Sequence, residues 1–333
     1  MEEYYNQIQQ IKFFDKIDHL EPITSGYSGS LCCRVKSNDK EYFVKIRSRN
    51  TVNFDANLEI FDKNNVLTPK LYDKGLVDGK QYFITEYIEG KHIKKHYDEL
   101  TYIQVYNYGK KIGSEQKEIA NLPSNTLPAY SSPTMYHVGK MRKTITGARE
   151  LLEQHKDKTT ADQYIFIDKF YKQIFDRYEN LEQIFINETE YYCHSDIKLG
   201  NFIYHDQKLY SVDFEETAHD NIAYKLRSEF FDIFECQPIR YKTWFFIKGF
   251  LDEFFNGTIP DTLPKALELM LYYILSKRLT ERITQDKFDV VSRLLNNLAK
   301  NIKEFGKIEN IFNFNGNVEN FLKNHIGTEI NKK

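Results

Sequence analysis

The sequence predicts an α+β fold with two lobes: a small N-terminal lobe with an antiparallel sheet, and a larger, mainly helical C-terminal lobe. Three observations predict it. Strand-like runs separated by short polar turns fill much of residues 23–88. Apolar residues recur every three or four positions over residues 160–186, which indicates a long helix packed on a core. After that helix, residues 191–215 concentrate polar side chains that can do chemistry. We expect the first lobe to span residues 1–89 and the second to span residues 90–333.

The composition is that of a globular protein without a strong electrostatic bias. The 333 residues carry a net charge of −2, and 41% of them are hydrophobic. This balance argues against a chain-wide surface for nucleic acid or anionic membranes. No segment approaches the roughly 20 apolar residues of a membrane-spanning helix, and the acidic start is unlike a secretory signal. The four cysteines lack metal-ligand spacing, which favours free thiols in a reducing compartment. We therefore expect a cytoplasmic protein.

The segment HSDIKLGN (194–201) is followed twelve residues later by the sequence DFE. Phosphoryl transfer to a hydroxyl needs a carboxylate that orients and deprotonates the acceptor, and two oxygen ligands for Mg²⁺. Asp196 fits the first role, and Asn201 with Asp213 fits the second. The residues between Asn201 and Asp213 have the pattern strand, polar turn, strand, a hairpin that would bring the two side chains together. An isolated HxDxxxxN sequence occurs by chance, but the second motif at this separation favours a kinase active site.

The N-terminal region offers a matching nucleotide site. We expect an opening amphipathic helix within residues 1–20, and the loop SGYSGS (25–30) then lies before a strand-like run. A Gly-rich hairpin brings backbone N–H groups close to phosphates, so the candidate phosphate contacts are Ser25, Gly26, Ser28 and Gly29. Lys45, in the strand-like sequence FVKI, has the position of a kinase lysine that contacts the α- and β-phosphates. Taken alone, the loop is equally consistent with a plain turn, and Lys45 with a solvated lysine on an edge strand. Their order along the chain favours nucleotide binding.

Three further residues complete the predicted nucleotide site. Glu59, in a helix-compatible segment, is expected to form an ion pair with Lys45 that holds the lysine toward the nucleotide. The sequence EYIEG (86–90) ends a strand, and the backbone near Glu86 and Ile88 is expected to contact the adenine edge. ATP and Mg²⁺ are the predicted cofactors, although the hinge sequence leaves GTP open.

With these segments in order, the chain resembles the aminoglycoside phosphotransferase and choline kinase family, which has a protein-kinase-like fold. The resemblance covers about residues 23–216 and rests on the segments SGYSGS, FVKI, EYIEG, HSDIKLGN and VDFEE, and on Glu59 before LTPKLY. It implies that Asp196 is the catalytic base and that Asn201 and Asp213 bind magnesium. It also implies that His194 supports the catalytic loop through packing and hydrogen bonds.

Lys198 leaves the class of acceptor open. It lies two residues after Asp196, where protein kinases have a lysine that contacts the transferred phosphate, and many small-molecule kinases of the resembled family lack it. A protein kinase is therefore one alternative, although DFE replaces DFG and no APE sequence follows. A pseudokinase that binds nucleotide without turnover is another, and the intact polar set argues against it. A further departure from the family's pattern is the stretch Lys111–Gln116, which has no histidine where family members commonly have Leu-His.

Acidic residues near and after the DFE motif are candidates for contacting the acceptor: Glu216, Asp220, Glu229 and Asp232. In the resembled family, this side of the helical lobe lines the acceptor pocket. Carboxylates there would suit a cationic amino alcohol or an aminoglycoside, although charged helix residues are more often simply solvated. The sequence thus predicts a kinase that phosphorylates a hydroxyl of a small molecule, and it does not predict the oligomeric state.

Overall fold

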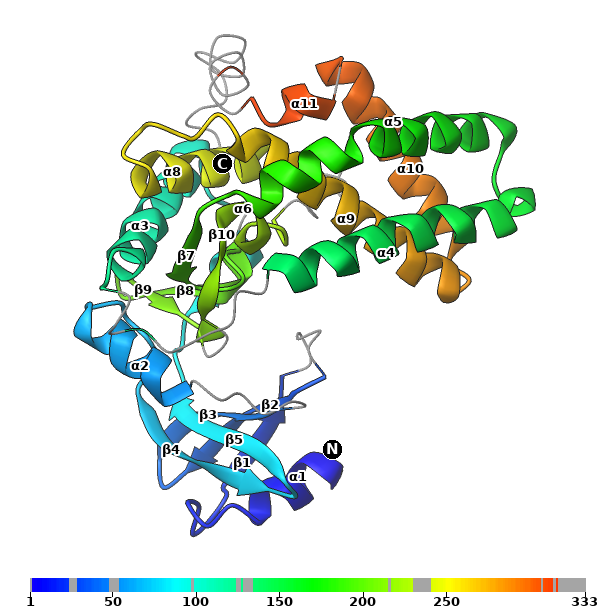
Figure 1. The fold of residues 1–333 in the computed structure, drawn as a ribbon. Coiled ribbons are helices and arrows are strands. Elements are labelled where there is room, and N and C mark those ends of the chain that lie inside the picture. Colours follow the sequence, from blue (N-terminus) through cyan, green and yellow to red (C-terminus); the bar gives the residue numbers. More distant parts are fainter. Residues whose placement is uncertain are drawn as a thin grey trace. The chain divides into compact units, whose positions relative to one another are not determined.

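The structure is a computed structural model, and it describes residues 2–23, 29–47, 54–96, 99–123, 127, 134–214, 217–229, 241–306, 308–313 and 316. The chain forms two compact units (Figure 1). Unit 1 comprises residues 1–95 with 200–216, and unit 2 comprises residues 96–199 with 217–333. Unit 1 therefore takes a short segment from the middle of the chain, and this segment contains the DFE motif.

Unit 1 contains a five-stranded antiparallel sheet in the order β1-β2-β3-β5-β4. Within residues 1–95, the described strands and α-helices of unit 1 are α1 (Glu2–Gln9), β1 (His19–Pro22), β2 (Leu31–Ser37), β3 (Lys40–Ile46), α2 (Phe54–Lys63), β4 (Leu71–Val77), β5 (Lys80–Glu86) and the short strand β6 (Lys91–His92). The antiparallel sheet predicted for the N-terminal lobe is confirmed. The opening helix expected within residues 1–20 is α1, which ends at Gln9.

Tight turns in unit 1 follow directly from residue type. The β2–β3 turn has φ of +49° at Asn38 and +59° at Asp39, and the β4–β5 turn has φ of +50° at Asp78 and +73° at Gly79. Two consecutive residues with positive φ define the turn that best matches the twist of a two-residue hairpin. Asn, Asp and Gly tolerate this backbone region better than other residues, so these sequences fix the hairpin register.

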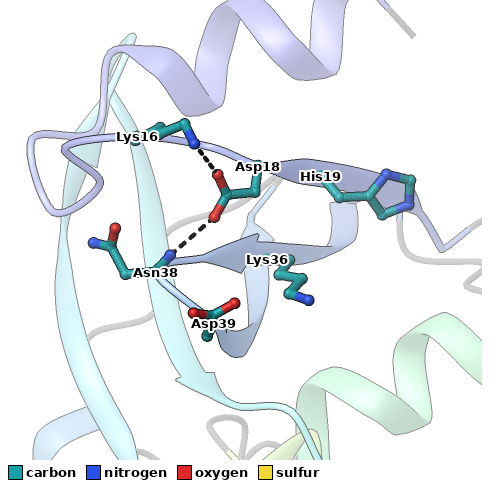
Figure 2. A pocket seen from close by; sticks show the side chains of 6 residues that line it. All are labelled: Lys16, Asp18, His19, Lys36, Asn38 and Asp39. Carbon is teal, nitrogen blue, oxygen red and sulfur yellow. Dashed lines mark hydrogen bonds and ion pairs between the residues drawn. The ribbon is translucent and has the colours of Figure 1, made fainter.

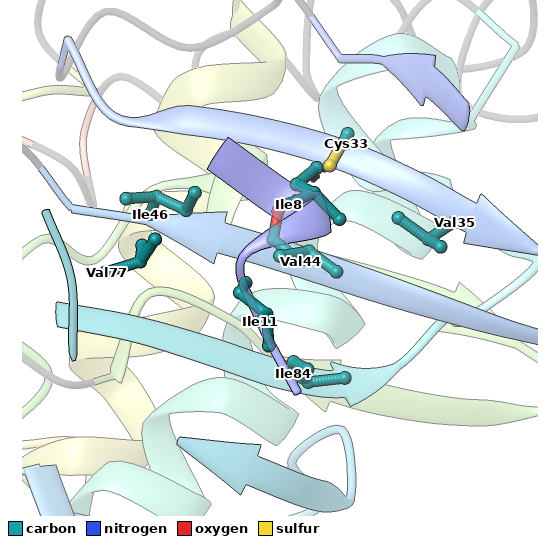
Figure 3. Close-up of a cluster of buried hydrophobic side chains, with 8 residues drawn as sticks. All are labelled: Ile8, Ile11, Cys33, Val35, Val44, Ile46, Val77 and Ile84. Carbon is teal, nitrogen blue, oxygen red and sulfur yellow. Dashed lines mark hydrogen bonds between the residues drawn. The ribbon is translucent and has the colours of Figure 1, made fainter. Parts of the chain in front are cut away.

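The core of unit 1 lies between α1 and one face of the sheet (Figure 3). Helix α1 and the residues just after it supply Ile8 and Ile11, which are 0% and 2% exposed. The strands supply the other buried members: Cys33, Val35, Val44, Ile46, Val77 and Ile84. Alternate residues of β3 point to this core, and Lys45 lies between two of them with its side chain directed to the opposite face.

A second sheet in unit 1 positions the middle segment of the chain. It has the order β6-β8-β9, with β8 (Phe202–His205) and β9 (Lys208–Ser211) paired as an antiparallel hairpin. A Cβ atom on Gly90 would lie 2.5 Å from the Ile203 side chain and 2.7 Å from the Tyr204 carbonyl oxygen. Glycine is therefore required there for the chain to pass close to β8.

Unit 2 is mainly helical, as predicted (Figure 1). Among the described residues, its main elements are α3 (Tyr102–Ala120), α4 (Thr134–Gln154), α5 (Ala161–Ile186), β7 (Glu190–Cys193), β10 (Ala218–Asn221), α6 (Ile222–Lys225), α8 (Tyr241–Phe254), α9 (Leu263–Thr284), α10 (Phe288–Phe305) and α11 (Ile308–Ile311). Capping boxes at Thr101 and Thr160 define where α3 and α5 begin. The helix predicted over residues 160–186 is confirmed.

Helices α3 and α8 pack with unusually close backbones. A Cβ atom on Gly109 would lie 2.2 Å from the Phe246 carbonyl oxygen, and one on Gly249 would lie 2.1 Å from the Tyr106 carbonyl oxygen. Small residues permit this approach because they remove the side chains that would separate two helices. The position of α3 in unit 2 therefore depends on glycines on both helices.

Candidate active site

In unit 1, Lys45 and Asp213 form an ion pair although 168 positions separate them in the chain. The distance from Lys45 Nζ to Asp213 Oδ1 is 2.6 Å, with the lysine side chain 12% exposed and the aspartate side chain 54% exposed. Lys45 comes from β3, and Asp213 follows the β8–β9 hairpin. The two residues predicted to contact phosphates and metal thus lie together.

The predicted hairpin between Asn201 and Asp213 is confirmed as β8–β9. At its base the Val212 N–H donates to the Asn201 carbonyl oxygen over 2.9 Å, which brings the chain back to its starting point. Asp213 has a φ of +59°, an uncommon conformation for a residue other than glycine and one that often accompanies functional sites.

Helix α2 holds the residue after Asp213. The Phe214 ring lies 5.4 Å from the Phe61 ring between centroids, and Asn57 Nδ2 donates to the Phe214 carbonyl oxygen over 3.4 Å. Asn57 is fully buried. Sequence reasoning did not single out Asn57, and its only signal was a polar residue one helical turn before the apolar Ile60 and Phe61.

Glu59 has a different partner from the one expected. It lies on the exposed side of α2, where its Oε1 is 2.5 Å from Lys63 Nζ, and both side chains are more than half exposed. The carboxylate that the structure pairs with Lys45 is instead that of Asp213. The physical reason is helical spacing: Asn57, Ile60 and Phe61 take the buried face of α2, which turns Glu59 toward solvent.

Three other residues predicted to contact the nucleotide, Gly29, Glu86 and Ile88, lie in the described part of the chain. Gly29 has a φ of +66°, which only glycine adopts readily. The Glu86 N–H donates to the Lys70 carbonyl oxygen over 2.8 Å, and Ile88 is 7% exposed. Their contacts with a nucleotide stay predictions.

Five of the predicted site residues lie outside the described part of the chain. Three belong to the Gly-rich loop and two to the set of candidate acceptor contacts: Ser25, Gly26, Ser28, Glu216 and Asp232.

In unit 2, two donors hold the carboxylate of Asp196. Lys198 Nζ pairs with its Oδ2, and the Ser228 hydroxyl donates to its Oδ1 over 2.5 Å. Burial by itself would raise the pKa of this carboxyl, but the positive charges of Lys198 and Arg227 and the two hydrogen bonds outweigh it and lower the pKa to about 2. Asp196 is therefore ionised at neutral pH.

The loop that carries Asp196 is fastened to residues 225–229. The Ile197 N–H donates to the Lys225 carbonyl oxygen over 2.9 Å, and Arg227 Nη1 donates to the Ser195 carbonyl oxygen over 2.8 Å. With the Ser228 contact, successive loop residues are each held by this one segment. Such repeated anchoring fixes the direction of the Asp196 side chain.

His194 lies at the start of the same loop and is fully buried. Its backbone N–H donates to Gln116 Oε1 over 2.8 Å, and its ring Nδ1 accepts the Asp196 backbone N–H over 3.1 Å. These are contacts of a residue that supports the loop. Gln116 on α3 falls in the segment where the sequence lacks the family's usual histidine, and that departure was the available signal for its role.

An aromatic stack connects α4 to the loop. The His137 ring stacks on the Tyr224 ring with centroids 3.8 Å apart, and the Arg227 guanidinium carbon lies 4.0 Å from the same Tyr224 centroid. Two groups this close to one ring centre must lie on opposite faces, because on one face they would overlap. Tyr224 is therefore held between His137 and Arg227, and Arg227 in turn contacts Ser195.

Two of the candidate acceptor carboxylates are used inside unit 2. Asp220 is 4% exposed; its Oδ2 lies 3.2 Å from His137 Nε2, and its Oδ1 accepts the Asn221 N–H over 2.9 Å. Glu229 is 2% exposed, and its Oε1 accepts the Leu199 N–H over 2.5 Å. Both carboxylates stabilise the site's framework, and nothing in this geometry assigns them to an acceptor.

A polar surface depression in unit 1 is separate from these residues (Figure 2). Asp18 lies at its centre, where Oδ1 pairs with Lys16 Nζ over 2.6 Å and Oδ2 accepts the Asn38 N–H over 3.1 Å. These contacts stabilise the β2–β3 turn. The depression is lined by Lys16, Asp18, His19, Lys36, Asn38 and Asp39, none of which belongs to the predicted site.

Comparison with known proteins identifies the class. The model of the phosphotransferase enzyme family APH matches residues 19–226. Among solved structures, aminoglycoside phosphotransferase APH(4)-Ia superposes with a TM-score of 0.58 at 12% identity, covering 91% of this chain and 99% of that one. Spectinomycin phosphotransferase APH(9)-Ia, solved with ADP and spectinomycin, gives a TM-score of 0.50 at 16% identity, covering 93% and 96%. No curated protein sequence matches.

The protein is thus a phosphotransferase, an enzyme that transfers a phosphoryl group, with a kinase-like fold. The chain belongs to the phosphotransferase enzyme family APH, because the family model matches more than half of it. The family resemblance predicted from the motifs is confirmed. Among the described helices, none combines the length and apolar character needed to cross a bilayer.

Proposed function

We propose that this phosphotransferase moves the γ-phosphoryl group of ATP, with Mg²⁺, to a hydroxyl of a small molecule. The observation that supports this most strongly is the Lys45–Asp213 ion pair, since it joins a strand lysine to the aspartate of the DFE motif at 2.6 Å. The solved relatives with bound ADP, which include spectinomycin phosphotransferase, support an adenine nucleotide.

Asn201 and Asp213 suit a magnesium ion. They offer an amide oxygen and a carboxylate at the two ends of one hairpin, and Mg²⁺ prefers oxygen ligands. Asp213 is 54% exposed while still paired with Lys45, so its carboxylate is accessible from solvent. When bound, Mg²⁺ would neutralise charge on the phosphate oxygens.

The remaining steps belong to side chains of this chain. Lys45 binds the α- and β-phosphate oxygens and orients the nucleotide. Asp196 accepts the proton of the acceptor hydroxyl as its oxygen forms a bond to the γ-phosphorus. The bond between that phosphorus and the β–γ bridging oxygen breaks, and ADP leaves with the bridging oxygen. Lys198, beside Asp196, stabilises the negative charge of the carboxylate before the proton arrives.

The acceptor is proposed as an alcohol, with amino alcohols and aminoglycosides as the first candidates. The relatives solved with spectinomycin and with hygromycin B support that choice. The buried Asp220 and Glu229 do not, because their oxygens are used within the fold. The groups that flank Asp196 in the described structure, Lys198 and Arg227, are positive, so neutral and anionic alcohols belong in the same test.

The test is an assay of ADP release with purified protein, ATP and Mg²⁺ against a panel of aminoglycosides, choline, ethanolamine, sugars and sugar phosphates. Stimulation by one class, with a phosphorylated product seen by mass spectrometry, is the expected result. Labelling of a protein substrate from radioactive ATP without any small-molecule product would instead establish the protein-kinase alternative. Nucleotide binding without turnover for the whole panel and for protein substrates would establish the pseudokinase alternative.

We expect Asp213→Asn to raise the Mg²⁺ concentration needed for half-maximal activity on the order of tenfold or more. Asparagine tolerates the φ of +59° at this position, so the substitution removes the negative charge and keeps the backbone conformation. Asp206→Asn is the matched control, since Asp206 also has positive φ, +46°, and lies in the turn of the same hairpin. Magnesium titrations that superpose for the two variants would contradict the metal role of Asp213.

We expect activity to be independent of Asp196 protonation between about pH 5 and 8. The pKa of this carboxyl is lowered to about 2, so the base is ionised above that pH and is lost only as the pH falls toward it. A pH profile of kcat/KM measures this. A decrease of kcat/KM below about pH 6 that disappears when Asp196 is replaced would show that the carboxylate is not held in its ionised form.

A further inference from the structure

Ser228 contacts the carboxylate of the proposed base directly, and the proposed reaction gives it no part. A carboxylate can only accept hydrogen bonds, so the 2.5 Å contact with Asp196 Oδ1 fixes the Ser228 hydroxyl as donor. Hydrogen bonds to an ionised acceptor are short and about twice as strong as neutral ones. With Lys198 on Oδ2, each oxygen of the base contacts a donor from the protein.

The direction of this contact is set by the surrounding chain. Ser228 lies between Arg227, which donates to the Ser195 carbonyl oxygen, and Glu229, which accepts the Leu199 N–H. Both neighbours are therefore fastened to the loop on either side of Asp196. A serine in this position has little freedom to turn away, and its donor reaches the base at no further cost in backbone entropy.

The two donors restrict the carboxylate in different ways. Lys198 belongs to the same loop, two residues from Asp196, and its flexible side chain supplies charge. Ser228 comes from a different segment, 32 positions along the chain. Ser228 therefore ties the orientation of the carboxylate plane to a segment of unit 2 outside the catalytic loop.

We propose that Ser228 is a positioning residue that orients the Asp196 carboxylate toward the acceptor hydroxyl. The proposal rests on the proposed function, in which Asp196 is the base. Misdirecting a reacting group by about 1 Å costs up to roughly 100-fold in rate. Removing the hydroxyl should thus slow the chemical step and leave nucleotide binding unchanged.

The experiment compares Ser228→Ala with Ser228→Thr, which keeps the hydroxyl. Ser292→Ala is the matched control, because Ser292 donates to Gln163 Oε1 elsewhere in unit 2. In an ADP-release assay we expect Ser228→Ala to lower kcat by about tenfold to 100-fold with an unchanged KM for ATP. Ser228→Thr should restore most of kcat, and Ser292→Ala should match the wild type. Equal kcat for Ser228→Ala and wild type would overturn the proposal.

A second readout is independent of turnover and separates this proposal from the proposed function. Carbon-13 NMR of labelled aspartate carboxyls, with Asp196 assigned through Asp196→Asn, follows the titration of the base. Loss of the Ser228 donor should raise the pKa of Asp196, against the remaining charges of Lys198 and Arg227 and the nearby Tyr224 hydroxyl. An inactive wild type would reject the proposed function, while an unchanged titration would reject the role of Ser228.

Two further outcomes are decisive. If Ser228→Ala does not fold, Ser228→Cys carries the test, since a thiol keeps the volume and donates only weakly. Its kcat should be lower than that of the wild type, and an equal kcat would overturn the proposal. Because the Ser228 hydroxyl faces the base as an acceptor would, intact-mass analysis after incubation with ATP is also needed. A phosphoryl group on Ser228 would overturn the positioning role and make this serine an acceptor.

Discussion

Asp196→Ala is expected to lower the rate of phosphoryl transfer by about 100-fold to 10,000-fold, the usual contribution of a general base. The carboxylate is ionised, with a pKa lowered to about 2, and alanine can neither orient nor deprotonate a hydroxyl. ATP binding should persist, because Lys45 and Asp213 are in the other compact unit of the chain.

The measurements are kcat for ADP release and a dissociation constant for ATP. Asp168→Ala is a suitable control, since Asp168 is an exposed aspartate of α5 that pairs with Arg149 in the same unit. Turnover close to that of the wild type in Asp196→Ala would contradict the proposed mechanism. Loss of ATP binding together with turnover would assign Asp196 to the nucleotide rather than to the acceptor.

The sequence was most informative where function depends on short, ordered motifs. The HSDIKLGN and DFE segments with the hairpin between them were predictable, because strand and turn preferences over residues 202–211 are local. Lys45 was recognisable because it follows a Gly-rich loop at the expected interval. In each case the chemistry and the local structure point to the same residues.

The contacts that hold the site were not predictable in the same way. Ser228 and Gln116 contact the catalytic loop from 32 and 78 positions away in the sequence. Local sequence patterns do not indicate contacts between residues so far apart. Glu59 failed as the expected partner of Lys45 because the buried face of α2 includes Asn57, a polar residue that sequence reasoning would place outside.

The acidic residues after the DFE motif show a second limit. In the sequence, an acidic residue looks the same whether its carboxylate binds a ligand or accepts a hydrogen bond from the backbone. Asp220 lies in β10 beside His137, and Glu229 accepts a backbone N–H of the catalytic loop. Burial decides between the two uses, and it depends on the tertiary structure.

The close packing of α3 and α8 leads to the largest expected effect on stability. A Cβ atom on Gly249 would lie 2.1 Å from the Tyr106 carbonyl oxygen, whereas ordinary contact begins at 3.4 Å. The helices must separate by the difference, 1.3 Å, or bend. We expect Gly249→Ala to destabilise unit 2 by about 3 kcal/mol or more, because backbone atoms cannot move aside like a side chain.

Gly139→Ala on α4 provides the matched control. Nothing lies within 4 Å of the Cβ position at Gly139, so only the helix preference for alanine remains, and a stabilisation of roughly 0.5–1 kcal/mol is expected. Urea unfolding followed by circular dichroism measures both variants. A Gly249→Ala protein as stable as Gly139→Ala would show that α3 and α8 are farther apart in solution.

The same substitution connects packing to catalysis. Helix α3 carries Gln116, whose side chain accepts the His194 N–H at the start of the catalytic loop, and His194 in turn accepts the Asp196 N–H. A shift of α3 away from α8 therefore displaces the backbone that supports the base. We expect Gly249→Ala to lower kcat even at temperatures where the protein remains folded, and Gly139→Ala to leave kcat unchanged. A destabilised Gly249→Ala enzyme with full kcat would show that the loop keeps its geometry without α3.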